Sequence, residues 1–186
     1  MLFPALGTVL LGGGAVTTGI LTAAVAVGTF ASSLFSGRVV QYRWHGRGIA
    51  RAVEAHGASI LAFGVVLLIG AFSDPATERI PNVALIIAAC IALALSGASD
   101  NVSSIYRNTM MQAAVPDTMR GRLQGVFIIV VAGGPRIGAL YAGTLASITT
   151  PWFPPLLGGI LVIALVALLA RRSSRFRAYD AENPEP

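Results

Sequence analysis

The chain has no lysine and very little charge of any kind. Its thirteen cationic side chains are all arginine, and only 11 % of its 186 residues are charged. A soluble domain carries about 25 % charged residues, so this deficit argues against a soluble fold. A Walker A phosphate loop and a Schiff base both require a lysine side chain. The missing lysine therefore excludes ATP hydrolysis at a Walker A loop within this chain.

Cysteine is almost as scarce. Cys90 is the single cysteine, which excludes an intrachain disulfide and a cysteine metal cluster. It lies in an apolar run, where a small buried hydrophobic residue is expected. We find no paired carboxylates, nucleophile elbow or cysteine–histidine set, and we predict that the chain is not an enzyme and holds no cofactor or metal. His45 and His56 lie in or beside a basic stretch and are predicted to be solvated loop residues.

Long charge-free runs fill most of the sequence. A helix needs about 20 apolar residues to cross the roughly 30 Å hydrocarbon core of a bilayer. The runs therefore predict an all-α membrane protein, a polytopic transmembrane helix bundle. Its full spans lie at about 15–36, 52–73, 81–114, 120–148 and 155–170. Residues 2–11 cover only half a bilayer and are predicted to be an N-terminal stub, the remainder of a first helix.

The arginines predict how the bundle is oriented. Eleven of the thirteen fall in the stretches 38–51, 107–122 and 171–177, which are alternate loops of the predicted bundle. By the positive-inside rule these stretches and the C-terminus are cytoplasmic, in a multi-pass protein of the plasma membrane. The arginines are expected to contact lipid headgroups rather than nucleic acid. We divide the chain into a membrane bundle at 1–172 and a polar tail at 173–186.

Polar residues inside the spans are the candidates for function. A charged group at the centre of a bilayer costs about 2.5–3.5 kcal/mol and usually faces a bundle interior or an aqueous cavity. We predict that Asp100 and Arg136 approach one another across a central cavity, although an ion pair that only locks two helices is the alternative. The candidate cavity or coupling residues are Asp100, Asn101, Ser104, Arg107 and Arg136.

The fourth span contains a second unusual feature, the sequence Gly133-Gly134-Pro135. Proline removes one helical hydrogen bond and glycine weakens the helix, so we predict a break or kink here. Alternatively, Gly134 and Gly138 form a small-residue contact that lets two helices approach closely. By contrast, 57–73 and 155–170 have almost no polar side chains and are predicted to be peripheral, lipid-facing helices.

A motif near the middle of the chain carries a family resemblance. The stretch 112–138 contains Pro-Asp-x-x-Arg-Gly-Arg-x-x-Gly, followed by Ala-Gly-Gly-Pro-Arg-Ile-Gly. It resembles the major facilitator superfamily, and more narrowly its enterobactin-exporter-like branch. There the motif is the cytoplasmic loop joining the tenth and eleventh of twelve helices. The matching residues include Pro116, Asp117, Arg120, Gly121 and Arg122.

The basic loop before the second span resembles another motif of that superfamily. Gly37, Arg38, Gly46 and Arg47 match its Gly-x-x-x-Asp-Arg-x-Gly-Arg pattern in the copy found in the second half of the fold. The aspartate is missing and the spacing between the glycines is longer. The resemblance makes these two motif stretches the candidate cytoplasmic gating loops. A charge relay through the present one is not expected, and Arg38 and Arg47 are left as headgroup anchors.

The resemblance implies half of a major facilitator fold, its C-terminal six helices with the first one truncated. It implies a secondary active exporter of small molecules such as drugs or siderophores, driven by a proton or other ion gradient. Such carriers rock two halves about a central site, so the partner would be the missing N-terminal half. The alternatives are a half-size protein acting as a homodimer or partner subunit, and a non-transporting remnant. Alone, the chain is not expected to transport.

Overall fold

The structure, a computed structural model, describes residues 14–72, 82–114 and 117–172. Five helices in these residues are long and apolar enough to cross a membrane, and no strand occurs among them. This confirms the prediction of an all-α membrane bundle. The helices are α2 (Gly14–Leu34), α3 (Ser36–Val40), α4 (His45–Phe72), α5 (Val83–Ala114), α6 (Asp117–Ile148) and α7 (Phe153–Arg172). The predicted stub at 2–11 and tail at 173–186 lie outside the described residues.

The basic stretch 38–51 is mostly helical, which corrects the prediction of a loop there. Arg38 lies in the short helix α3, and α4 already begins at His45. Arginine, alanine and glutamate are good helix formers, and residues 45–56 contain no proline. A change in charge marks the edge of the hydrocarbon layer, whereas the helix itself continues into the headgroup region.

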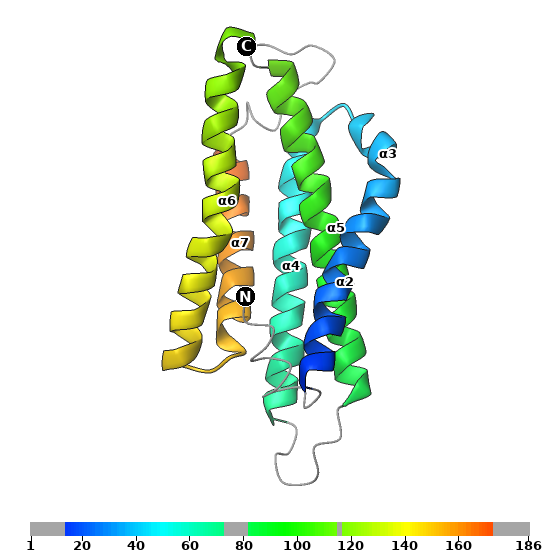
Figure 1. The fold of residues 1–186 in the computed structure, drawn as a ribbon, viewed down its shortest axis with the longest axis vertical. Coiled ribbons are helices and arrows are strands. Elements are labelled where there is room, and N and C mark those ends of the chain that lie inside the picture. Colours follow the sequence, from blue (N-terminus) through cyan, green and yellow to red (C-terminus); the bar gives the residue numbers. More distant parts are fainter. Residues whose placement is uncertain (1–13, 73–81, 115–116, 173–186) are drawn as a thin grey trace.

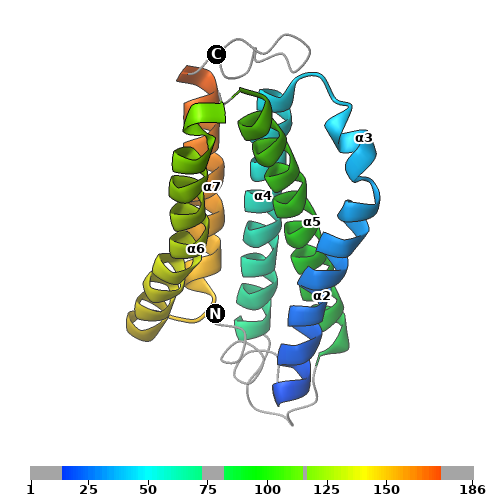
Figure 2. The ribbon, with the colours of Figure 1, turned by 45° about the horizontal axis from the view of Figure 1, so that its top comes forward.

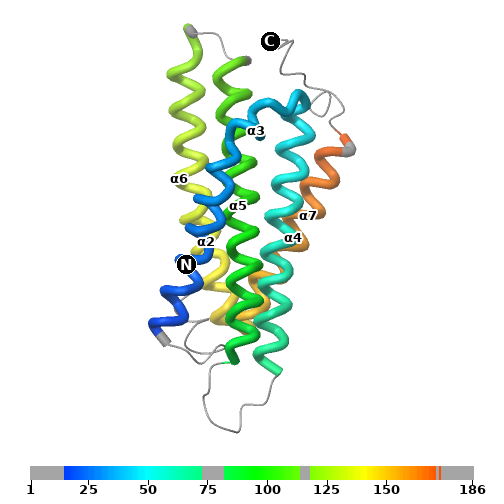
Figure 3. Tube along the Cα trace, turned by 90° about the vertical axis from the view of Figure 1, so that its right-hand side faces the viewer, coloured from blue at the N-terminus to red at the C-terminus, as the bar shows by residue number. Residues whose placement is uncertain are grey.

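The long helices stand side by side in the spatial order α6, α7, α4, α5, α2 (Figures 1 and 2). α4 packs against both α5 and α7, and α5 packs against both α4 and α2. α4 is therefore a central element of this chain rather than the predicted peripheral helix. α6 makes its main contact, a small one, with α7. The short helix α3 joins α2 to α4 and lies against α5 (Figure 3).

Two helix pairs are held close together by glycine. A Cβ atom on Gly28 of α2 would collide with the carbonyl of Ala94, and one on Gly97 of α5 would collide with the carbonyl of Val25. In the second pair, a Cβ on Gly159 of α7 would lie 2.7 Å from the backbone nitrogen of Leu61 in α4. Small residues allow such backbone approach, which helps apolar helices to associate in lipid.

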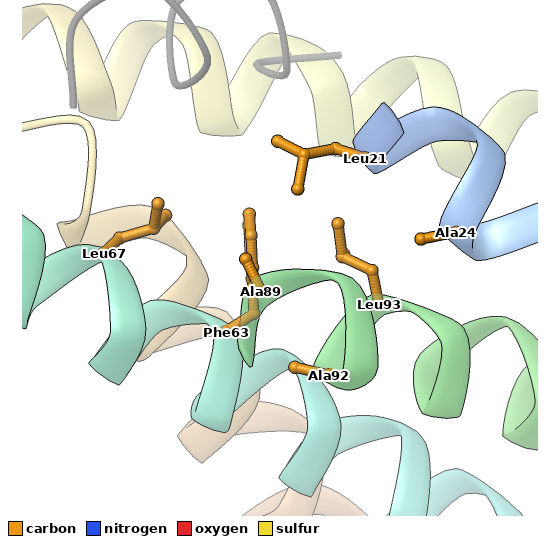
Figure 4. Packing of buried hydrophobic residues seen from close by; sticks show 7 residues of the cluster. All are labelled: Leu21, Ala24, Phe63, Leu67, Ala89, Ala92 and Leu93. Carbon is orange, nitrogen blue, oxygen red and sulfur yellow. The ribbon is translucent and has the colours of Figure 1, made fainter. Parts of the chain in front are cut away.

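The apolar core lies toward one end of the bundle, where α2 and α5 begin and α4 ends (Figure 4). Its side chains come from three helices and fill the space between them: Leu21, Ala24, Phe63, Leu67, Ala89, Ala92 and Leu93. We call the opposite end, which carries Arg38, Arg43, Arg47 and Arg51, the arginine end. The packing is thus tight and apolar at one end and more polar at the other.

Candidate functional site

The polar residues of α5 point in different directions. Asp100 lies 3.6 Å from Arg107 on the same helix, and the two side chains are 66 % and 40 % exposed. The Nε–H of Arg107 also donates to the carbonyl of Ser103, at 3.3 Å. Helical rise places Asp100 about 21 Å along α5 from Ala114, well within a bilayer. α5 therefore presents an accessible ion pair at membrane depth.

The predicted approach of Asp100 to Arg136 is not found in this structure. Arg136 is exposed near the middle of α6, with no ion pair to any residue that the structure describes. α6 makes its main contact with α7 and has no substantial contact with α5, the helix that carries Asp100. The carboxylate of Asp100 is instead paired with Arg107 of its own helix.

Asn101 holds two helices together. Its Nδ2 amide donates to the hydroxyl of Ser32 at 2.9 Å and to that of Ser33 at 3.0 Å, and it lies 3.3 Å from the carbonyl of Thr29. All three partners belong to α2. The hydroxyl of Thr29 in turn lies 3.3 Å from the carbonyl of Gly97. Asn101 therefore braces the contact between α2 and α5, and Ser104, one turn beyond Asp100, is half-buried.

His56 is not the solvated loop residue that the basic stretch beside it predicts. It lies inside α4, about 17 Å along the helix from His45. Its Nδ1 is 3.1 Å from both the carbonyl oxygen and the hydroxyl of Ser96 in α5. Nδ1 can donate to that carbonyl as N–H or accept from that hydroxyl, so either tautomer keeps the link between the helices. The helical spacing of His56 to Ser59 and Phe63 was the signal that pointed to a buried face.

His45 is likewise not a solvated loop residue. It is buried at the first turn of α4, with Nε2 3.3 Å from the carbonyl of Val40 and its ring centroid 5.3 Å from that of Tyr106. Both histidines were misplaced because the helix begins ten residues before the charge-free run that follows Glu54.

The predicted break or kink does not interrupt α6, which stays helical through Gly133, Gly134 and Pro135. Pro135 lies inside the helix Asp117–Ile148, which changes direction along its length and leans away from the bundle in its second half (Figure 1). A Cβ on Gly133, Gly134 or Gly138 would meet no atom within 4 Å. The alternative prediction, a close contact through Gly134 and Gly138, is therefore also not seen among the described residues.

The predicted gating residues are arranged around the arginine end. Gly37 and Arg38 lie in α3, while Gly46 and Arg47 lie in the first turn of α4. The guanidinium carbons of Arg43 and Arg47 lie 5.5 Å and 5.0 Å from the ring centroid of Trp44. These distances are typical of cation–π contacts.

The turn between α5 and α6 holds the second predicted gating motif. Pro116 lies outside the described residues, and Asp117 is the first residue of α6. Arg120 donates from Nη2 to the carbonyl of Gln112 at 3.3 Å, which ties the start of α6 to the end of α5. Gly121 and Arg122 are exposed.

Comparison with known proteins identifies the relatives of this chain. The enterobactin exporter EntS of Citrobacter koseri is 29 % identical over 162 residues, which is 86 % of this chain and 35 % of the relative. EntS of Escherichia coli UTI89 is 29 % identical over 154 residues, 81 % of this chain and 33 % of the relative. EntS of Salmonella typhi is 34 % identical over 85 residues, 45 % of this chain and 20 % of the relative. The chain is similar to the enterobactin exporters.

This relationship confirms the resemblance to the exporter branch of the major facilitator superfamily. The chain spans about a third of the length of the exporters that it matches over most of its own length. No family model matches the chain, and no solved structure matches it. Five apolar helices and the similarity to membrane exporters together indicate an integral membrane protein.

Proposed function

We propose that the chain forms the C-terminal half of a secondary active exporter of small molecules, working by alternating access. Its arginine end would face the cytoplasm. One observation carries the proposal: charged side chains remain exposed at membrane depth on α5 and α6. Asp100 is 66 % exposed, and Arg136 is exposed as well. Each such charge would cost about 2.5–3.5 kcal/mol in lipid, so a polar cavity or a second protein surface is the expected neighbour.

In this proposal the cavity lies against the exposed faces of α5 and α6. Asp100 and Arg107 supply one acid and one cation, and Ser104 supplies a hydroxyl. Arg136 supplies a second cation when the other half brings α6 toward the cavity. Asn101 keeps α2 attached to α5 while the halves move. A carboxylate in such a cavity can exchange a proton for a substrate, which is how a proton gradient would drive export.

The partner in this proposal is a second membrane unit that covers α6. α6 is 32 residues long and apolar, yet none of its described side chains is fully buried. The matched region is about a third of the length of the relatives. The rest of their length supports a partner at least as large as this chain. Such a unit would be an N-terminal half, and a second copy of this chain is the competing arrangement.

The roles of Asp100 and Arg136 can be tested by export measurements in membrane vesicles. The gene that carries this chain would be expressed with Asp100→Asn or Arg136→Gln, with Thr144→Val on the exposed face of α6 as the matched control. We expect at least a tenfold loss of gradient-driven export for the first two and no loss for the third, at equal membrane levels. Export at the parent rate in both charge-neutral variants would contradict the proposal.

Orientation can be tested separately, because Cys90 is the single cysteine. In a Cys90→Ser background, Arg47→Cys and Thr150→Cys place one thiol at each end of the bundle. We expect an impermeant maleimide applied to intact cells to label position 150 and to leave position 47 unlabelled. Labelling in the reverse pattern would invert the proposed topology without affecting the assignment of the cavity.

A further inference from the structure

A cavity at the arginine end is separate from the exposed ion pair of α5. It has a volume of about 410 Å³ and lies between α4, α5 and the segment that follows α3. Asp100, Ser104 and Arg107 do not line it. Its walls are mainly apolar, from small side chains that include Ala52, Ala55 and Ala98.

Small residues and one wedged ring explain why the cavity exists. The ring of Tyr106 lies directly against Gly48, where a Cβ atom would approach its Cε2 and Cζ to 2.7 Å. Beyond this contact, Ala52 and Ala55 of α4 lie opposite Ala98 of α5 in the cavity lining. Three methyl side chains do not fill the space between the helices. The result is an apolar recess with an aromatic boundary.

The polar groups of the cavity favour an anion. Arg51 lines it, together with the side chains of Tyr42 and Tyr106. The guanidinium of Arg51 is exposed and makes no ion pair with any described residue. Arg51 also lines a neighbouring cavity of about 320 Å³ on the side of α7, where Arg47 and Glu54 lie. Two arginines, Arg47 and Arg51, and one glutamate, Glu54, line this neighbouring cavity, which leaves a net positive charge beside Arg51.

The position of Arg51 along α4 indicates which kind of anion the cavity binds. Arg51 lies six residues into α4, about 9 Å from its start. Trp44 immediately precedes the same helix, and tryptophan is enriched where a membrane meets water. A free phosphate would use the cation and leave the alanine walls empty. A phospholipid uses both, because its phosphate reaches the cation and its acyl chain covers the apolar wall. Basic pockets between transmembrane helices bind anionic headgroups in this way.

We propose that the cavity between α4 and α5 binds one anionic phospholipid, with its phosphate at Arg51 and the start of an acyl chain along Ala52, Ala55 and Ala98. The tyrosine hydroxyls of Tyr42 and Tyr106 are placed to donate to the headgroup. This site does not depend on the proposed export function, because none of the proposed transport residues of α5, Asp100, Ser104 and Arg107, lines it.

The test is lipid retention by the purified 186-residue chain. The chain would be reconstituted in equimolar phosphatidylglycerol and phosphatidylcholine, extracted mildly, and its bound lipid measured by native mass spectrometry. We expect phosphatidylglycerol to be enriched at least fivefold over phosphatidylcholine in the parent. Arg51→Gln should abolish the enrichment, and Arg51→Lys should keep part of it.

Two further variants separate a specific site from general attraction. Ala55→Leu fills the recess without changing charge and should also abolish the enrichment. Arg38→Gln removes an exposed arginine that does not line the cavity, and should leave the enrichment intact. Circular dichroism of each variant establishes that its helices form.

Three outcomes would overturn the proposal. In the first, Arg51→Gln retains phosphatidylglycerol as the parent does. In the second, Arg38→Gln loses as much of the phosphatidylglycerol enrichment as Arg51→Gln does, which would mean that only the net charge of the arginine end determines lipid binding. In the third, millimolar inorganic phosphate displaces the lipid while Ala55→Leu has no effect, which would identify a phosphate site without a lipid component.

Discussion

α5 and α6 are consecutive helices of equal length that are packed in very different ways. Each contains 32 residues, and each carries a charged side chain at membrane depth. α5 is covered by α4 on one side and α2 on another, and it buries Ala89, Leu93 and Ser103. α6 touches α7 lightly and has no fully buried side chain among its described residues.

The difference lies in which small residues meet another helix. In α5, Gly97 fits against the backbone of α2, and Ser96 meets His56 of α4. In α6, the glycines face open space. Lipid tails are as apolar as a leucine side chain, so hydrophobicity does not determine which helices associate inside a membrane. Close backbone fit and interhelical hydrogen bonds determine it instead. α6 has the residues for such a fit, but its glycines meet no helix among the residues that the structure describes.

The largest expected effect comes from filling the glycine contact of α5. Gly97→Leu would drive a side chain into the backbone of α2, which cannot move aside without separating the helices. We expect the free energy of unfolding in bicelles to fall by about 3 kcal/mol or more. Gly134→Leu on α6 is the matched control and should change it by less than about 0.5 kcal/mol. Equal losses in both variants would show that α6 is packed in the isolated chain.

A smaller effect is expected from a cavity in the apolar core. Leu93 of α5 is 1 % exposed and Leu140 of α6 is 68 % exposed. Leu93→Ala should lower the free energy of unfolding by about 2–4 kcal/mol through lost contacts, and Leu140→Ala should leave it nearly unchanged. Denaturation in mixed micelles, followed by tryptophan fluorescence, measures both. A cost at Leu140 that matched Leu93 would remove the distinction between the two helices.

The smallest effect is expected from the hydrogen bonds between α5 and α2. Asn101→Val removes an amide that donates to Ser32 and Ser33, and we expect a loss of about 1–2 kcal/mol. Thr144→Val on α6 removes a hydroxyl that bonds only to carbonyls of its own helix, and should cost little. The same unfolding measurement compares them. If Asn101→Val were neutral in stability yet abolished export, Asn101 would belong to the transport cavity instead.

Sequence predicts the features that depend on a single helix. The end of α5 at Ala114 was expected because no helix breaker occurs before Pro116, and the five spans follow from the length of the apolar runs. The start of α4 was misplaced because charge reports where the hydrocarbon layer ends and not where helical hydrogen bonding ends. His45 and His56 were misplaced for the same reason.

Contacts between helices were much harder to predict. The approach of Asp100 to Arg136 was inferred from depth alone, but depth does not state which helices are neighbours. Gly134 and Gly138 have the spacing of a packing motif, while the glycines that pack, Gly28 and Gly97, lie on different helices and share no local pattern. The residues of a helix–helix contact are recognised only when both surfaces are known.

The spatial order of the helices has a consequence for biosynthesis. α2 packs on α5, so the first long helix has its main partner beyond the next long helix in the sequence, whereas α4 packs on α5, which follows it, and on the last helix, α7. Both α2 and α4 enter the membrane before α5 has been translated. Until α5 is inserted, the hydroxyl groups of Ser32 and Ser33 lack their interhelical partner Asn101, and the ring of His56 lacks Ser96. Translational pausing or truncation before α5 would therefore expose these polar groups to membrane quality control.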